Sequence, residues 1–183
     1  FPFKEEGMKS RLIYPMLAAG IVALAMGAQG IASSDSRSGP NHLRVALDGF
    51  QENPSISTTG RGHLDLRIDD DAQEIHYELS YSNLEGVLVA GGQVAAAHIH
   101  LGARGVNGAV AAFLCGGGGK PACPTPEGSV TGTIVASDVI GPAGQGINAG
   151  EPTAFEEFVR AIRAGYTYAN VHTTRWPGGE IRG

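Results

Sequence analysis

Hydrophobic and polar residues alternate along several short segments of the chain, and this alternation predicts β-strands. The acidic run Asp69–Asp71 separates two of these segments and predicts a tight hairpin. A later β-branched stretch has the composition that strands favour. The segments expected to be strands are 42–50, 63–68, 74–81, one or two strands within 87–101 interrupted near residues 91–92, 109–114, 129–135 and 166–173.

One segment near the end of the chain has helical instead of strand periodicity. Thr153 and Glu156 have the spacing of a capping box, and Gly165 is a natural stop for a helix. The apolar residues between them recur at helical spacing and are Phe155, Phe158, Val159 and Ile162. Seven or eight strands with one short helix predict an all-β fold, a Greek-key-like β-sandwich of the immunoglobulin or superoxide-dismutase kind, or a barrel flattened into one.

The first part of the chain has a different pattern. Residues 12–32 contain no charged side chain, and basic residues precede them. One interpretation is a signal peptide with small-residue cleavage positions near Ala28 or Ala32. The other is a retained transmembrane helix, because about 20 apolar residues can cross a bilayer. The expected division is a cytoplasmic N-terminus 1–11, the apolar segment 12–32, a polar linker 33–41 and a globular domain 42–183.

Small residues inside the apolar segment favour retention in a membrane. Ala19, Ala23 and Gly27 recur every four residues and would form a stripe suited to close helix packing. The flanking basic residues would hold the N-terminus in the cytoplasm. We therefore expect a single-pass protein of the inner (cytoplasmic) membrane with its domain in the periplasm, or a secreted or periplasmic domain if the segment is cleaved.

Composition narrows the classes of partner. The 183-residue chain has a formal net charge of −5 and has no run of Lys and Arg, so nucleic-acid binding is not expected. Its two cysteines, Cys115 and Cys123, bracket a glycine-rich stretch. In a domain on the far side of a membrane, where disulfides persist, they predict a disulfide that closes a small loop.

Histidines carry the candidate chemistry. His98 and His100 lie two residues apart in a predicted strand, so their rings share one face, and His172 could join them if the last strand is a neighbour. Three imidazoles suit Zn(II) or Cu(II), with His76 as a less certain fourth ligand. The alternative is a structural role, in which the histidines hydrogen-bond to loops. No catalytic residue is predicted.

Several motifs in the chain form a recognisable set. They are GFQENP (49–54), AHIHLG (97–102), GVNG (105–108), GYTYANVHT (165–173) and PGGEIRG (177–183). Together they resemble one family, the CHRD (chordin-type) domain of bacterial exported proteins. The resemblance implies an all-β sandwich over about residues 43–183, and bacterial members mostly lack an established activity. Glu180 and Arg182 recur in the family motif, where an ion pair, an end-strand anchor or support for a histidine is expected.

Three functions follow as expectations. The first is a non-catalytic, membrane-anchored accessory subunit of a larger membrane complex, for which a bioenergetic complex is a natural host. Its partners would be membrane protein subunits that contact the N-terminal helix and the sandwich. The second is an exported copper- or zinc-binding protein that uses His98, His100 and His172. The third is a superoxide-dismutase-like redox enzyme.

Overall fold

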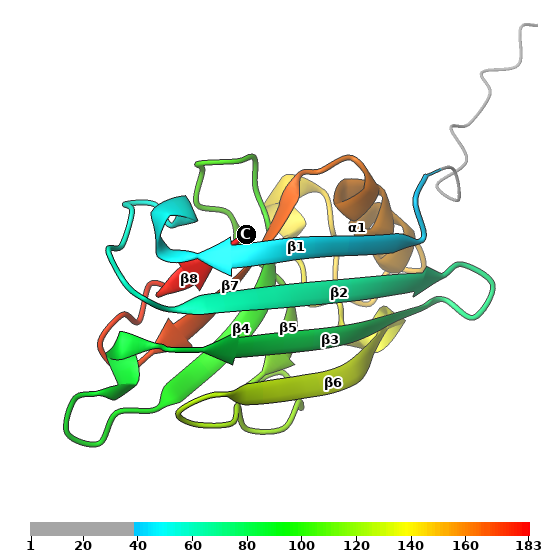
Figure 1. Cartoon of the computed structure of the whole chain (residues 1–183). Helices are drawn as coiled ribbons and strands as arrows, with labels where there is room; N and C mark the ends of the chain where they lie inside the picture. The colour runs from blue at the N-terminus through cyan, green and yellow to red at the C-terminus, as the bar shows by residue number, and fades with distance from the viewer. Residues whose placement is uncertain (1–38) are drawn as a thin grey trace, which may run out of the picture. The chain divides into compact units, whose positions relative to one another are not determined.

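A computed structural model describes residues 39–183 of the chain. These residues form one eight-stranded antiparallel sheet with the strand order β5-β4-β7-β8-β1-β2-β3-β6 (Figure 1). The strands are β1 (His42–Asp48), β2 (Arg61–Asp69), β3 (Glu74–Ser82), β4 (Val94–Leu101), β5 (Ala109–Cys115), β6 (Gly128–Val135), β7 (Thr167–Thr173) and β8 (Ile181–Arg182). The single α-helix among these residues is α1 (Ala154–Arg163).

The sheet curls on itself, so that its two end strands approach each other. In Figure 1, β1, β2, β3 and β6 lie in front, and β4, β5 and β7 cross behind them. The Tyr77 hydroxyl of β3 donates a hydrogen bond to the Leu114 carbonyl of β5 at 2.7 Å. After β6, the amide of Ile140 donates to the Ala111 carbonyl of β5 at 2.9 Å. The all-β prediction with one short helix is confirmed, but the layers are parts of one near-barrel sheet.

Strand β8 is only two residues long, yet it joins the two layers. Arg182 pairs with Asp48 of β1 on one side and with Asn170 of β7 on the other. The last strand of the described residues thus lies in the middle of the sheet, beside the first strand. This late strand places the last segment of the chain directly beside β7, which carries His172.

The core fills the space between the layers. Alternate residues of β2 and β3 point inward, as their sequence pattern predicted, because a period of two puts every second side chain on one face. Helix α1 closes one end and buries its apolar stripe, including Phe158 and Ile162. The buried residues of β2 and β3 are Leu64, Leu66, Ile68, Ile75, Tyr77, Leu79 and Tyr81.

The predicted capping box at the start of α1 is wrong. Thr153 has a helical backbone conformation (φ −88°, ψ −9°), and its side chain makes no capping hydrogen bond. A capping side chain needs an extended backbone at that position, because only then does its oxygen reach the free amides of the first turn. The amide of Glu157 instead donates to the Thr153 carbonyl at 2.9 Å.

The cysteine prediction is confirmed. Cys115 and Cys123 form a disulfide with an S–S distance of 2.02 Å, which ties the end of β5 to the loop that follows it. The expected signal or transmembrane segment 12–32, with Ala19, Ala23 and Gly27, lies outside the described residues. Between residues 39 and 183, no helix is long and apolar enough to cross a bilayer.

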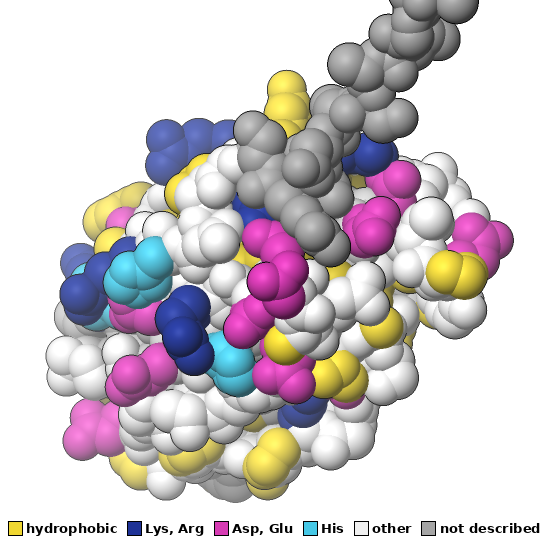
Figure 2. Space-filling model, turned by 90° about the vertical axis from the view of Figure 1, so that its right-hand side faces the viewer, with side chains coloured by type: hydrophobic (Ala, Val, Ile, Leu, Met, Phe, Trp, Pro, Cys, Tyr) yellow, Lys and Arg dark blue, Asp and Glu magenta, His cyan; other side chains and the backbone are white. Residues whose placement is uncertain are grey.

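The surface of the domain carries charges of both signs. Figure 2 shows a face on which Asp and Glu side chains gather near the middle, with Lys and Arg side chains around them. On the sheet, Arg44 of β1 lies 3.6 Å from Asp65 of β2 across a strand pair, and both side chains are partly exposed. This hydrated outer face of β1, β2 and β3 contrasts with the outer face of β4 and β7.

Candidate metal centre

The pairing of β4 with β7 brings the three predicted histidines together. The two strands run antiparallel, with His98 opposite Asn170 and His100 opposite Tyr168. His172 lies two residues beyond Asn170, opposite Ala96. The hypothesis that the last long strand neighbours the His98–His100 strand is therefore confirmed. Since residues two apart share a face, all these polar side chains stand on the outer side of the sheet.

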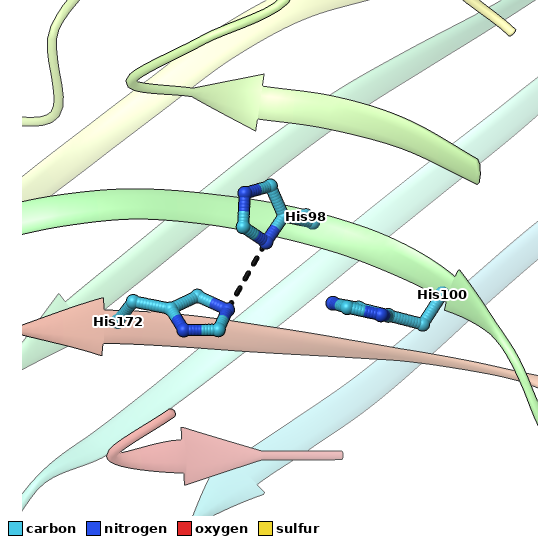
Figure 3. Close-up of side chains that lie close together, drawn as sticks. All are labelled: His98, His100 and His172. Carbon is cyan, nitrogen blue, oxygen red and sulfur yellow. Dashed lines mark hydrogen bonds between the residues drawn. The ribbon is translucent and has the colours of Figure 1, made fainter. Parts of the chain in front are cut away.

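The three imidazoles face one another (Figure 3). One ring nitrogen from each of His98, His100 and His172 lies within 4.8 Å of the others. The closest pair is His98 Nδ1 and His172 Nε2, at 3.0 Å. A four-coordinate Zn(II) ion binds nitrogen at about 2.0–2.1 Å, which places its ligand atoms roughly 3.3 Å apart. The cluster is thus close to the size that one ion requires.

Backbone carbonyls fix the orientation of two rings. Nδ1 of His172 lies 2.9 Å from the Pro177 carbonyl, and Nδ1 of His100 lies 3.0 Å from the Gly108 carbonyl. A carbonyl oxygen only accepts, so both Nδ1 atoms carry the hydrogen, and both Nε2 atoms hold a lone pair in the neutral ring. Metal-binding histidines in proteins typically donate their second nitrogen in this way.

Burial keeps the rings neutral. His100 and His172 are about nine-tenths buried, and His98 is partly buried. Loss of hydration disfavours the imidazolium form and lowers the pKa of His98 to about 3, with the neighbouring histidines adding to the effect. Burial also lowers the pKa values of His100 and His172. Neutral imidazole is the form that binds a metal ion.

Nε2 of His100 is buried and has no hydrogen-bond partner. Within residues 39–183 only one other buried side-chain atom shares this property, Oε1 of Glu52. A buried polar atom without a partner costs about 1–3 kcal/mol, so such atoms are uncommon unless they have a ligand. The lone pair of His100 points into the space between the three rings (Figure 3).

Aromatic rings enclose the cluster. The His100 ring stacks on Tyr168, with centroids 4.8 Å apart and planes 4° from parallel. The guanidinium of Arg182 lies over the Tyr168 ring at 3.3 Å, a cation–π contact. Phe113 of β5 packs edge-on against His98 at 4.5 Å. These contacts fix the ring positions and shield them from water.

Asn170 and Glu52 form a polar layer beside the cluster. Oδ1 of Asn170 lies 2.9 Å from His172 Nε2. Burial raises the pKa of Glu52 to about 7, while the Arg182 charge and the Asn170 amide act in the opposite direction. Gly179 makes room for both groups: a Cβ there would lie 2.2 Å from Glu52 Oε1 and 2.7 Å from Asn170 Nδ2.

Loops from distant parts of the sequence cover the cluster. The segment after β1 carries Asn53, whose Nδ2 donates to the Gly105 carbonyl at 2.8 Å. In return, Asn107 Nδ2 donates to the Asn53 carbonyl at 3.0 Å. The turn 176–179 covers the His172 side through the Pro177 carbonyl. Three separate segments thus bury a strand face that the alternation pattern alone would leave in water.

The structure does not bring His76 into the cluster. His76 lies on β3, with Nδ1 3.1 Å from Thr133 Oγ1 and Nε2 3.4 Å from Glu74 Oε2. Its side chain is 37 % exposed. The predicted group of four histidines is therefore a group of three, because β3 and β4 belong to opposite layers of the curled sheet.

The two charged residues of the last motif have separate roles. Glu180 is fully buried and accepts hydrogen bonds from the hydroxyls of Thr58 and Thr173, at 2.7 and 2.9 Å. The backbone amides of Glu85 and Gly86 also donate to it, at 2.7 and 2.9 Å. Glu180 thus anchors the end of the chain, as one of the two expectations stated. Arg182 supports the histidine cluster through Tyr168.

Sequence reasoning missed Glu52 and Phe113 as neighbours of the cluster. Glu52 lies in an irregular segment 46 residues before His98, and no spacing rule connects the two. Its signal was membership of the motif GFQENP (49–54), where an acidic residue lies in an otherwise neutral loop. Phe113 occupies an outward-facing position of its strand, where an aromatic side chain indicates a covered surface.

Comparison with known families adds one finding to this geometry. The family model of the CHRD domain matches residues 43–183 of the chain. The match covers the whole sheet except the first residue of β1, and it includes all three histidines of the cluster. Neither the comparison with curated proteins nor the comparison with solved structures gave a match.

Proposed function

The chain belongs to the CHRD domain family, and on that premise we propose that this domain binds one divalent transition-metal ion through His98, His100 and His172. The observation that carries the proposal is the convergence of three ring nitrogens within 4.8 Å, one of them a buried lone pair with no other partner. A purely structural role would use that lone pair in a hydrogen bond.

The chemistry of the cluster favours Zn(II) or Cu(II). Both ions bind neutral imidazole, and the described neighbourhood offers no thiolate, since both cysteines are in a disulfide. The Pro177 and Gly108 carbonyls hold two rings with their Nε2 atoms turned inward. Little rearrangement is needed for binding, which favours affinity because few groups must be ordered on binding.

Equilibrium dialysis of the full chain against Zn(II) or Cu(II), followed by metal analysis, tests this function. The wild type should retain one equivalent. His100→Ala should lower the affinity by at least about 100-fold, because it removes a ligand and leaves the other two without a third. His76→Ala is the matched control, since His76 lies outside the cluster, and it should bind like the wild type.

Two results would contradict the proposal. The first is wild-type protein without stoichiometric metal after dialysis. The second is equal loss of metal in His76→Ala and His100→Ala, which would indicate adventitious surface binding. In the Cu(II) form, electron paramagnetic resonance gives an independent reading, because three bound imidazole nitrogens produce nitrogen hyperfine structure. Loss of one histidine should reduce that structure.

A second candidate role concerns the N-terminal part of the sequence. We propose that residues 12–32 anchor the domain in a membrane, with the domain on the far side, as an accessory subunit of a larger complex. The support is the uncharged run with its stripe of Ala19, Ala23 and Gly27. The intact mass of protein purified from its native membrane tests this role. A mass that begins near residue 33, without co-purifying subunits, would contradict it.

A further inference from the structure

We infer that the carboxamide oxygen of Asn170 is the fourth ligand of the same metal ion, which completes a closed site of three nitrogens and one oxygen. The inference rests on the metal site proposed above and adds a residue to it. Asn170 occupies the same face of β7 as His172 and lies directly opposite His98 in the strand pairing.

The hydrogen positions around His172 lead to this assignment. Nδ1 of His172 faces the Pro177 carbonyl and carries the hydrogen, so Nε2 holds a lone pair. That lone pair meets two atoms, His98 Nδ1 at 3.0 Å and Asn170 Oδ1 at 2.9 Å. The first can donate a hydrogen, but an amide oxygen cannot. Two acceptors therefore face each other at hydrogen-bond distance with no hydrogen between them.

Turning the amide around does not remove the conflict. Nδ2 of Asn170 donates to the Gly178 carbonyl at 3.5 Å. In this orientation the amide nitrogen faces a carbonyl oxygen, which only accepts. The reverse orientation would point the amide oxygen at the Gly178 carbonyl. The surroundings of Nδ2 thus hold Oδ1 toward the histidines.

A cation among these atoms resolves the conflict. Oδ1 of Asn170 lies 2.9 Å from His172 Nε2, and the cluster also contains His100 Nε2, which has no hydrogen-bond partner. In the His98 tautomer that carries its hydrogen on Nε2, Nδ1 adds a fourth lone pair to this group. Contacts of 2.9–3.0 Å between such atoms are shorter than the roughly 3.3 Å between ligands of a four-coordinate ion, so a small outward shift accommodates the metal.

A fourth protein ligand changes what the site can do. Catalytic zinc sites keep one position for water or substrate, whereas structural sites fill all four positions with protein atoms. If Asn170 completes the coordination, the ion has no open position. The site then only holds the metal. A superoxide-dismutase-like reaction would need an open position on the ion for its substrate, and this site would have none.

The test uses the full chain loaded with Co(II), whose visible d–d bands report coordination, titrated with azide. In the wild type the bands should have the intensity of a four-coordinate ion and should not change with azide. In Asn170→Ala a water should take the vacant position, so azide should bind saturably and shift the bands. The Co(II) affinity of this variant should fall by at least about tenfold.

Two further variants complete the design. Asn170→Asp keeps an oxygen at the same place and should stay insensitive to azide. Asn148→Ala removes the same side chain from a partly exposed loop position outside the cluster, where its amide donates to Glu151, and should match the wild type. If far-UV circular dichroism shows that Asn170→Ala does not fold, the wild type and Asn170→Asp still decide the question.

The outcomes separate the two proposals. Azide-dependent bands in the wild type, or an Asn170→Ala variant identical to it, would overturn the fourth ligand and leave the three-histidine site in place. Absence of stoichiometric Co(II) bands in the wild type would overturn the metal site itself.

Discussion

The outer faces of two strand pairs, β2–β3 and β4–β7, start from the same sequence pattern and differ in their surroundings. Outward-facing polar residues, including histidines, recur at alternate positions in β2, β3 and β7 and in the His98–His100 part of β4. On β3, His76 is partly exposed and contacts Glu74 and Thr133. On β4, His98 faces other rings under loops. Alternation decides which face a side chain takes, and the loops decide whether that face meets water.

This difference explains why only one of the two faces offers a site. The ring nitrogens of a hydrated histidine can form hydrogen bonds with water, so they do not reduce the stability of the protein. Under the loops at 102–108 and 176–179, His100 Nε2 has no such partner. The covered face thus converts an ordinary polar pattern into a group of lone pairs that require a ligand. Four predictions test that comparison, from the largest expected effect to the smallest.

Substitution of the two glycines of the turn 176–179 should change the stability of the domain by very different amounts. Gly179→Ala should destabilise the domain by about 3 kcal/mol, because a Cβ would lie 2.2 Å from Glu52 Oε1 and because φ is +123°. Gly178→Ala should change stability by less than about 0.5 kcal/mol, since a Cβ there meets nothing within 4 Å. Urea unfolding of both variants measures the difference, and equal effects would mean that the cover is not tightly packed.

Acid should lower the stability of the metal-free protein through the histidines of the covered face. The folded pKa of His98, about 3, is below the ordinary value of 6.5, so the unfolded chain binds more protons between these values. The contribution of His98 to the free energy of unfolding is fully present above pH 6.5 and is lost as the pH falls toward 3. One such histidine should cost about 2 kcal/mol between pH 8 and pH 5. In His98→Asn, the free energy of unfolding measured with urea should depend less on pH than in the wild type.

Glu52 should have the opposite pH dependence. Its folded pKa of about 7 is above the ordinary value of 4.5, so its contribution is fully present below pH 4.5 and is lost as the pH rises through 7. Glu52→Gln should therefore stabilise the metal-free protein by about 1 kcal/mol at pH 8 and have no effect at pH 4.5. The exposed Glu78→Gln serves as the control. A loss of stability at pH 8 in Glu52→Gln would show that the charged form is favoured.

The smallest effect is expected on the hydrated face. Asp65 lies 3.6 Å from Arg44 and 3.9 Å from His42, whose side chains are 67 % and 74 % exposed. Exposed ion pairs contribute about 0–1 kcal/mol, so Asp65→Asn should lower stability by less than about 0.5 kcal/mol. Thermal unfolding in low and high salt measures this. A larger effect would indicate that the contrast between the two faces is weaker than the burial suggests.

The sequence predicted the strands well because their signal is local. The period of two in 63–68 and 74–81 indicates both the strands and the residues that face the core. The His98–His100 pair and the last strand with His172 were recognisable for the same reason. Their proximity depended on one further fact, the pairing of β4 with β7, which the sequence left as a hypothesis.

The parts that sequence reasoning did not reach depend on long-range packing. Glu52 meets the cluster because β8 brings the end of the chain between β1 and β7. Thr153 has the residue type of a cap but a helical backbone, which tertiary packing sets. His76 has the right residue type and strand position but lies in the other layer. Residue pattern thus identified candidates, and topology selected among them.

A chain is synthesised from its N-terminus, so the late position of β7 in the sequence decides when the histidine cluster can form. His98 precedes His172 by 74 residues, and the turn that holds His172 is within the last eight residues given. A chain stopped before β7 has two histidines on a strand that lacks one neighbour. The three-nitrogen cluster therefore exists only in the finished domain. A metal ion that needs all three ligands would enter only after β7 has been made, and its binding would report that β7 has paired with β4.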